Sequence, residues 1–389
     1  MQQDDKPLVS IIVPAYNAEN YVEHMVHDIR SQEYARLECI IVDDGSSDNT
    51  VQVITRLIKD DLRFVLKRHK KNRGLSAARN TGYGVATGKY VIFLDVDDEF
   101  RPQLTQDALC RAEETDADIV IFNFDEYRSE KKIRFKNRID TVKNPSKRIF
   151  TIDDFVAYSD EPRFGIFLEM VWNKFYKKSF LDQHDIRFNE KLLRAEDTAF
   201  TIRTYLLAEK ISYLPQSLLT YVTEIKTSNQ GTISKHPTAF LAMFDDLREF
   251  LYQQNIYSKY MHDLRDLAVA YIIGNLMNGS VDTQRNIIIE GKQFSKSFGI
   301  KPNTVKGISA VKRQMLTAFI DSDFDAYIDA QKAFFISERD DLLSRIPPLE
   351  DRIQLELAEL SIYRDNPSIH TAYTQLMKAV RRKLGSKFS

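Results

Sequence analysis

The first 125 residues alternate between two hydrophobic periodicities, and this alternation restricts the fold more than any other feature of the chain. Apolar residues recur at the three-and-four spacing of amphipathic helices in the longer segments. Five short apolar runs between them have the length and β-branched content of buried strands: 8–14, 37–44, 63–68, 90–95 and 118–124. Continuous apolar strands that alternate with helices predict an α/β fold with a mostly parallel sheet and helices on both faces.

Acidic residues cluster where two of these runs end. Asp43 and Asp44 follow the second run, and Asp95, Asp97 and Asp98 follow the fourth. Ligands of open α/β sheets bind beyond the carboxyl ends of the strands. We therefore expect these carboxylates at a binding site.

The spacing of Asp95 and Asp97 indicates a cation. Side chains alternate along a strand, so both carboxylates point the same way if the extended backbone persists. Two ionised carboxylates that close repel each other unless one binds a proton or a cation. An oxygen-only pair suits Mg²⁺ or Mn²⁺, with positions left open for phosphates. A polar turn at the strand exit, where Asp is common, is the alternative interpretation.

Composition excludes several other classes of protein. The 389 residues carry 55 Lys and Arg against 56 Asp and Glu, and a net charge of −1 predicts no nucleic-acid partner. Two cysteines, Cys39 and Cys110, cannot form a disulfide framework. The start has no basic and apolar regions of a signal peptide, and no apolar stretch approaches the ~18 residues of a membrane span. We expect a soluble, cytoplasmic protein.

The length suits two domains, with a boundary near residue 236. Residues 1–236 hold the strands, including an expected strand pair at 210–222 that Pro215 interrupts. Long amphipathic segments follow, so 237–389 is expected to be a helical domain. The nine Lys and Arg of 128–148 predict a solvated loop.

Four blocks of sequence identify a family. They are VSIIVPAYNAENYV, IIVDDGSSDNT, NRGLSAARNTGYGVATGKYVIFLDVDDEF and AEDTAF. In this order and spacing, across residues 7–225, they resemble the family 2 glycosyltransferases of GT-A fold, whose core is a Rossmann-like sheet. The resemblance implies an inverting enzyme of bacterial cell-surface polysaccharide synthesis. Such an enzyme moves a sugar from a nucleotide sugar, usually UDP-linked, to a hydroxyl of a glycan, teichoic acid or glycoprotein acceptor.

The resemblance also implies where the donor binds. Its nucleotide base would contact Pro14, Tyr16 and Asp44, with Asp43 in support. Tyr16 would stack on uracil, and Asp44 would accept the imide N–H.

The residues expected to bind the diphosphate side of the donor lie in a later block. By the resemblance, Asp95 would face the ribose and diphosphate, and Asp97 would be the chief ligand of Mn²⁺ or Mg²⁺. Arg79 and Asn80 would lie near the phosphates or the sugar. An exposed position on its helix is the alternative interpretation for Arg79.

The general base is expected at Asp197 in AEDTAF, with Glu196 beside it holding the acceptor or the sugar. Inversion needs one displacement at the anomeric carbon, so a carboxylate must take the proton of the acceptor hydroxyl. Acidic residues in the first turn of a helix also complement the macrodipole, which is the alternative reading of this pair. Trp172, the only tryptophan, is interpreted as a core anchor or as a platform for a sugar ring.

Two other functions compete with glycosyl transfer. A sugar-1-phosphate nucleotidyltransferase would carry a glycine-rich loop with a basic residue after the first strand, where this chain has PAYNAEN. A non-catalytic nucleotide-sugar-binding or scaffolding protein would need neither metal ligand nor base, and the chain has candidates for both.

The helical region is assigned only by general expectation. The resemblance implies acceptor binding, membrane docking or oligomerisation. Basic residues and helically spaced apolar residues at 376–388 allow peripheral contact with anionic lipid at the inner face of the cell membrane, and a solvated helix is the alternative. Apolar helix faces after 237 allow a homo-oligomer. A loop at 228–236, with His236, is a candidate cover for the diphosphate.

Overall fold

The computed structural model describes most of the chain: residues 6–128, 131–134, 149–155, 164, 170–222, 235–278, 281–305, 310–321, 326–331 and 333. Packing divides the chain into two compact units, Met1–Phe324 and Asp325–Ser389. The helices and strands named below all belong to the first unit.

Three predictions concern residues at the limits of this description. Most of the basic stretch 128–148, most of the loop 228–236 and the whole tail 376–388 lie outside the described residues. The boundary expected near residue 236 falls inside the first compact unit. The separate roles assigned to 1–236 and 237–389 stay a prediction.

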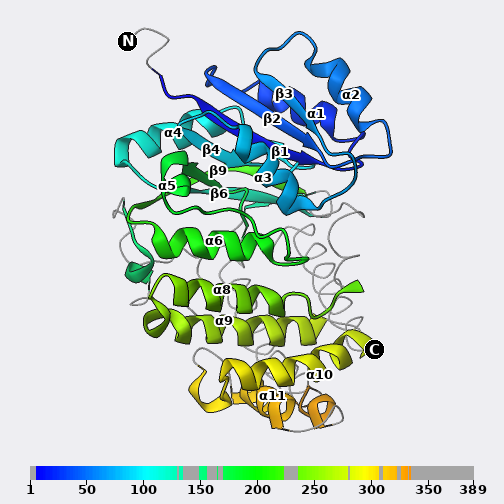
Figure 1. Ribbon diagram of the computed structural model, residues 1–389, viewed down its shortest axis with the longest axis vertical. Helices are drawn as coiled ribbons and strands as arrows, with labels where there is room; N and C mark the ends of the chain where they lie inside the picture. The colour runs from blue at the N-terminus through cyan, green and yellow to red at the C-terminus, as the bar shows by residue number, and fades with distance from the viewer. Residues whose placement is uncertain are drawn as a thin grey trace, which may run out of the picture. The chain divides into compact units, whose positions relative to one another are not determined.

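The described strands form one mixed sheet, in the order β3-β2-β1-β4-β8-β6-β9-β5, with β7 beside β6 (Figure 1). Their bounds are β1 Val9–Ala15, β2 Leu37–Asp43, β3 Phe64–Arg68, β4 Tyr90–Phe93, β5 Glu99–Phe100, β6 Ile119–Arg128, β7 Lys131–Arg134, β8 Lys174–Lys177 and β9 Ile211–Val222. Strands β3, β2, β1 and β4 are parallel. Their carboxyl ends therefore meet at one edge, as the acidic strand ends predicted.

The second half of the sheet was not predictable in detail. Strand β8 lies antiparallel between β4 and β6, so the two apolar runs at 90–95 and 118–124 are not neighbours. Strand β9 pairs in parallel with β6. It is one strand, and not the expected pair, because the register moves from Phe122–Leu214 to Asn123–Ser217 and leaves Pro215 in a bulge. A proline without an N–H is tolerated at such a bulge.

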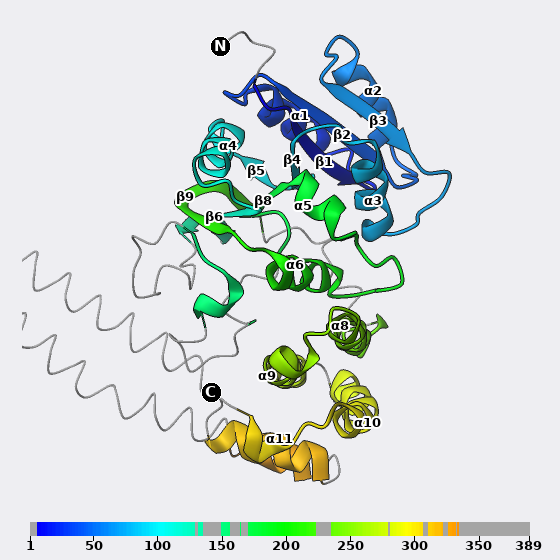
Figure 2. The same cartoon turned by 60° about the vertical axis from the view of Figure 1, so that its left-hand side comes forward.

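Helices occupy both faces of the sheet and then continue away from it (Figures 1 and 2). Their bounds are α1 Val22–Arg30, α2 Thr50–Ile58, α3 Leu75–Val85, α4 Leu104–Thr115, α5 Lys178–Gln183, α6 Glu196–Leu207, α8 Leu241–Gln253, α9 Tyr257–Asn278, α10 Val281–Phe298 and α11 Ala310–Asp321, with short 3₁₀ turns at Ile152–Phe155 and Pro302–Thr304. In both views α6, α8, α9 and α10 follow one another in successive layers below the sheet.

The alternation of side chains along β1 divides the core in two. Ile11 and Val13 join the apolar cluster under α1, α2 and α4. Ile12 points to the opposite face, where a Cβ on Gly82 of α3 would lie only 2.5 Å from its Cγ2. Small residues in α3 therefore let that helix approach the sheet closely. The predicted cover of helices on both faces is confirmed.

Trp172 is a core residue. It is 3% exposed, stacks on Tyr221 of β9 at 5.2 Å and meets Phe124 of β6 edge-on at 4.7 Å. The interpretation of this side chain as a sugar platform is wrong, because both neighbours enclose it.

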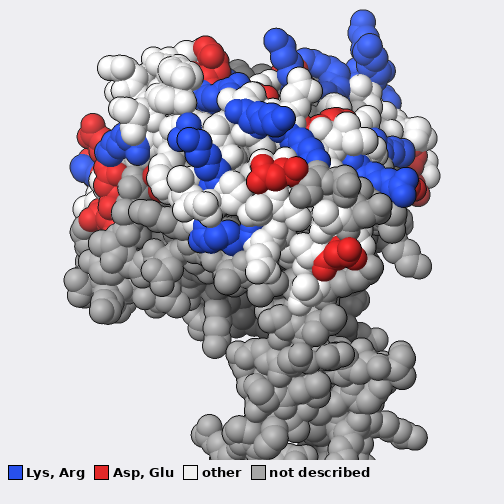
Figure 3. Space-filling model, turned by 90° about the horizontal axis from the view of Figure 1, so that it is seen from below, with Lys and Arg blue, Asp and Glu red and all other residues white. Residues whose placement is uncertain are grey.

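The surface mixes charges of both signs. Figure 3 shows Lys and Arg side chains standing among Asp and Glu side chains on the described part of one face. In the part of the chain that the structure describes, no helix combines the length and apolar character needed to cross a bilayer.

The turn after β2 supplies a test of the local fold. Gly45 has φ +76°, and a Cβ there would lie 2.6 Å from the carbonyl carbon of Lys71. We expect Gly45→Ala to lower the free energy of unfolding by about 2 kcal/mol or more, since the left-handed backbone alone costs about 1–2 kcal/mol. Urea denaturation measures the change. Gly84→Ala is the control, because that position in α3 is open, and the extra methyl should stabilise by up to about 1 kcal/mol. Equal effects of both changes would contradict the argument.

Candidate functional site

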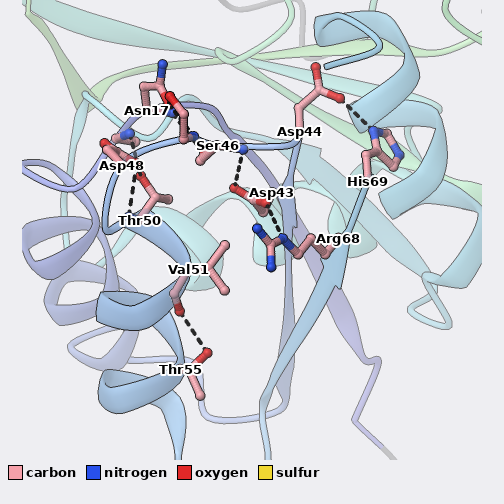
Figure 4. Close-up of polar contacts among 12 residues, drawn as sticks. Asn17, Asp43, Asp44, Ser46, Asp48, Thr50, Val51, Thr55, Arg68 and His69 are labelled. Atoms are coloured by element: carbon pink, nitrogen blue, oxygen red, sulfur yellow. Dashed lines mark hydrogen bonds and ion pairs between the residues drawn. The ribbon is translucent and has the colours of Figure 1, made fainter. Parts of the chain in front are cut away.

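The loops after β1 and β2 are bonded to each other at the carboxyl edge of the sheet (Figure 4). Asn17 donates its backbone N–H to Ser46 Oγ at 2.9 Å, and its Oδ1 accepts from the backbone N–H of Ser47 at 2.9 Å. Ala18 N–H donates to Thr50 Oγ1 at 2.7 Å. Asn17 itself adopts φ +49°, a conformation that Asn tolerates. These bonds hold the residue before Asn17 at the rim.

That residue is Tyr16, with half of its surface exposed. A large exposed ring on a rigid loop can stack on a flat ligand such as a nucleotide base. Pro14, in contrast, is buried within β1 beside Val42 of β2. Tyr16 is therefore accessible to a ligand, and Pro14 shapes the strand beneath it.

Asp43 and Asp44 lie at the carboxyl edge of the sheet and also stabilise the local fold. Asp43 is fully buried and accepts hydrogen bonds from Ser46 N–H and Arg68 Nε, both at 3.2 Å. Asp44 accepts bonds from His69 Nδ1 at 2.6 Å, from Arg73 N–H at 2.9 Å and from Gly74 N–H at 2.8 Å. Since a carboxylate can accept about four bonds, Asp44 retains capacity for one more donor. The contact of Asp44 with a nucleotide base stays a prediction.

The acidic segment after β4 is crowded. Asp98 is buried and accepts from the N–H of Val222 through Oδ1, while its Oδ2 has no hydrogen-bond partner among the described residues. Burial, with a further contribution from Asp95, raises the pKa of Asp97 to about 6. Burial and the neighbouring carboxylates Asp95 and Asp97 also raise the pKa of Asp98. Such crowding is relieved by a proton or a cation.

The donor set fits a magnesium or manganese ion that completes its coordination elsewhere. Within the described ranges, no group of three or more His, Cys, Asp and Glu side chains is arranged to hold a metal. Mg²⁺ is commonly held by one or two carboxylates together with substrate phosphates and water. Asp97, with Asp95 beside it, matches that pattern, and Asp98 Oδ2, which has no hydrogen-bond partner among the described residues, belongs to the same segment.

Arg79 joins two parts of the predicted site. Its side chain is fully buried in α3 and forms ion pairs with Asp95 through Nη2 at 2.9 Å and with Asp197 through Nη1. Its guanidinium also lies over the Phe188 ring, 5.2 Å from the centroid. The interpretation of Arg79 as an exposed helix residue is wrong, because both neighbouring carboxylates draw its charge inward. Burial lowers the pKa of Arg79, but Asp197 and Asp95 outweigh it and raise the value.

Asp197 lies in the first turn of α6, with a quarter of its side chain exposed. Burial raises the pKa of Asp197 to about 7; Arg79 lowers it, and Glu196 and Asp95 raise it further. The residue before this turn, Ala195, adopts φ +59°, an uncommon conformation for alanine that is typical of functional sites. The structure thus combines an accessible carboxylate with a pKa near neutrality, which a general base requires.

Asn80 has a different geometry from the one expected. Its Nδ2 donates to the Phe188 carbonyl at 2.9 Å and to Glu190 Oε1 at 3.1 Å, and its Oδ1 accepts from Phe188 N–H at 3.0 Å. The amide therefore fastens α3 to the segment that leads into α6. A direct contact between Asn80 and the donor stays a prediction.

Sequence reasoning missed two residues of this region. His69 bridges Asp44 and the hydroxyl of Thr81, at 2.6 Å and 2.9 Å. Phe188 stacks on Phe200 of α6 at 4.0 Å and covers Arg79. No local pattern marks either one, because their partners are distant in the sequence.

Comparison with known proteins bears on the family. Residues 10–184 match the family model described as glycosyl transferase family 2. The chain therefore contains a segment that is similar to the family 2 glycosyltransferases. The predicted resemblance is thereby confirmed, and the matched segment includes every predicted site residue except Glu196 and Asp197.

Relatives in bacteria agree. The chain is 29% identical to EpsH of Bacillus subtilis over 279 residues, which cover 69% of this chain and 76% of EpsH. It is 27% identical over 235 residues to poly(ribitol-phosphate) beta-N-acetylglucosaminyltransferase TarS of Staphylococcus aureus, which cover 59% of this chain and only 38% of TarS. The chain thus spans less than half of the TarS chain.

A solved structure shows the same fold. Residues 1–349 of S. aureus TarS, in complex with UDP, superpose with a TM-score of 0.64 at 20% identity, covering 85% of this chain and 91% of the other. The GT-A fold followed by a helical region, as predicted, is confirmed.

Replacement of Arg79 tests the buried network. We expect Arg79→Met to lower the free energy of unfolding by about 3 kcal/mol or more, since removing one partner of a buried ion pair leaves uncompensated charge. Urea denaturation at pH 7.5 measures the change. Arg73→Met is the matched control: that side chain is 48% exposed and pairs with Glu190, so a loss below about 1 kcal/mol is expected. Similar losses in both variants would show that the buried ion pairs of Arg79 stabilise the fold no more than the exposed pair of Arg73 does.

Proposed function

We propose that the chain is an inverting glycosyltransferase that moves a sugar from a UDP-sugar to a hydroxyl of a glycan, teichoic acid or glycoprotein acceptor. The observation that carries the proposal is the bridge by Arg79 between Asp95, at the end of β4, and Asp197, in α6. It joins the expected donor side and the expected base. The solved structures of TarS with UDP and with UDP-GlcNAc support a UDP-linked donor, with N-acetylglucosamine as the first sugar to try.

Donor binding would use the strand ends. Tyr16 would stack on uracil from its exposed position, and Asp44 would accept the imide N–H with its remaining capacity while Asp43 holds the turn. Asp95 would face the ribose and diphosphate. Asp97 would hold Mn²⁺ or Mg²⁺, which supplies positive charge to the departing diphosphate when it is bound.

Transfer would be a single displacement at the anomeric carbon. The acceptor oxygen forms the new glycosidic bond while the bond from the anomeric carbon to the UDP oxygen breaks, and UDP leaves with that electron pair. Asp197 receives the proton of the acceptor hydroxyl. Arg79 opposes the effect of burial on Asp197 and so favours the ionised form that can accept this proton.

The competing functions explain less of the geometry. A nucleotidyltransferase has no use for a base on α6 beyond the sheet, and the turn after β1 lacks the expected glycine-rich loop. A scaffolding protein would not need a buried arginine placed between two carboxylates, an arrangement that costs desolvation energy.

Nucleotide binding tests the donor site. We expect UDP to bind the wild-type chain more tightly with Mn²⁺ than without it, because Asp97 would hold the ion and the ion would supply positive charge to the diphosphate. In Asp97→Ala, isothermal titration calorimetry should show a loss of about tenfold or more of the Mn²⁺-dependent affinity, the scale of a weakened metal site. Asp60→Ala, at an exposed acidic position after α2, should leave the affinity unchanged. If UDP binds equally well with and without the ion, the assignment of Asp97 is wrong.

The pH profile tests the base. Because Asp197 has its pKa raised to about 7, the rate of transfer, or of donor hydrolysis by water, should rise from pH 6 to pH 8 as this carboxyl loses its proton. Glu196→Gln removes a charge that raises the pKa of Asp197, so the midpoint should move to lower pH. Asp197→Asn should reduce kcat by about 10²–10⁴-fold. An unchanged profile in both variants would contradict the role of Asp197.

A further inference from the structure

A cavity of about 400 Å³ lies beside the proposed base and has no role in the account above. Three segments line it: residues 73–76 at the start of α3, residues 190, 192–196 and 198 in and before the first turn of α6, and Tyr271 in the middle of α9. Glu196 and Thr198, the neighbours of Asp197, are both in the lining. The volume is near the lower end of the ~300–1,000 Å³ of small-molecule sites, so it suits one small ligand.

The lining offers hydrogen bonds without net charge. Two arginines and two glutamates contribute to it, so their formal charges cancel. Arg73 is paired with Glu190 at 3.1 Å. Arg194 donates to the carbonyls of His236 and Pro237, at 3.3 Å and 3.0 Å, and to Asn275 Oδ1 at 3.1 Å. An uncharged ligand matches this balance better than an anion or a cation does.

One buried hydroxyl in the lining is unused. Ser76 is 5% exposed, and its Oγ has no hydrogen-bond partner among the described residues. It belongs to the first turn of α3, whose N-cap residue, Gly74, supplies no side-chain hydrogen bond. A buried hydroxyl left unpaired costs about 1–3 kcal/mol, so a ligand hydroxyl in the cavity would relieve that cost. Leu75 and Leu192 add the apolar surface on which the C–H face of a sugar can pack.

The wall opposite α3 is held in place by contacts from the helical layer. Tyr271 shares a hydrogen bond of 2.8 Å with Thr198 Oγ1, and the Phe244 ring meets its ring edge-on at 5.4 Å. Asn275, one turn later in α9, donates through Nδ2 to the Tyr271 carbonyl at 2.9 Å and receives the bond from Arg194. The cavity is therefore preformed, with the position of α9 coupled to the first turn of α6.

We propose that this cavity binds the accepting unit, an uncharged sugar or polyol, and that Ser76 and Tyr271 determine which unit is accepted. The proposal rests on the proposed function, because it takes Asp197 as the base. A polyhydroxyl ring could also come from the donor, whose own sugar has the same chemistry. The test separates the two sources.

The experiment measures probe binding to the full chain saturated with UDP and Mn²⁺, by saturation-transfer NMR. The neutral probes are ribitol, methyl β-D-glucopyranoside and its 2-acetamido-2-deoxy analogue, and inorganic phosphate is the anionic comparison. We expect at least one neutral probe to bind, and Ser76→Ala and Tyr271→Phe each to raise its Kd about fivefold, the effect of one lost neutral hydrogen bond. Tyr252→Phe, at a half-exposed tyrosine of α8 outside the lining, is the matched control and should not change Kd.

Stability distinguishes binding from a structural role. Ser76→Ala removes an unpaired buried hydroxyl, so its thermal unfolding midpoint should stay the same or rise while probe binding falls. A weaker fold together with weaker binding would indicate a structural role and overturn the proposal for Ser76.

Other outcomes also overturn the inference. They are binding of no neutral probe to the UDP-loaded chain, equal affinity in the variants and the wild type, and preferential binding of phosphate. Displacement of the probe by UDP-GlcNAc but not by UDP would assign the cavity to the donor sugar. Failure of UDP itself to bind the wild type would instead contradict the proposed function.

Discussion

The site depends on one buried guanidinium. Burying an arginine costs several kcal/mol of solvation unless partners compensate for it, and Arg79, with no exposed surface, is compensated by Asp95 and Asp197. Asp95 follows β4 and Asp197 lies in α6, and the two residues are 102 positions apart along the chain. Arg79 lowers the pKa of Asp197, so this carboxyl would be more weakly ionised without the arginine. The ion pairs therefore set both the distance between the donor side and the base, and the balance that leaves the pKa of Asp197 near neutrality.

The loops at the carboxyl edge of the sheet are held by hydrogen bonds and form a fixed surface near Asp95 and Asp197. Side chains in the loops after β1 and β2 satisfy each other's backbone groups, which leaves Tyr16 exposed on a fixed loop. Asp44 holds the turn before α3, and α3 carries Arg79. Asp43 and Asp44, which are expected to contact the ligand, thus also stabilise the local fold. Changes at Asp43 or Asp44 are expected to affect stability and binding together, which is why Asp97 is the sharper probe of the donor site.

The helical layers are part of the site and not an appendage to it. Asp246 of α8 accepts from Arg203 of α6 at 2.6 Å and from Asn189 at 2.8 Å, on either side of the base. Tyr271 of α9 shares a hydrogen bond with Thr198 in the first turn of α6, and Asn275 of α9 accepts from Arg194, which precedes that helix. Asp197 is therefore positioned from α3 by Arg79, and the segment around it is held from α8 and α9 by these bonds. If the cavity binds the acceptor as proposed, this arrangement would let the region after residue 237 select the acceptor without supplying a catalytic group.

The sequence by itself determined what depends on local order: the alternation of strands and helices, the acidic strand ends, the family resemblance and the identity of the candidate base. Apolar periodicity and short motifs are local features of the chain, so they can be recognised from the sequence alone. Only the tertiary structure decided which long-range partners meet. It inserted β8 between β4 and β6, buried Arg79, engaged Asn80 with Phe188 and Glu190, and closed the cavity with Tyr271. The physical reason is that ion pairs, side-chain hydrogen bonds and cavities join segments distant in the sequence, and no periodicity records such pairings.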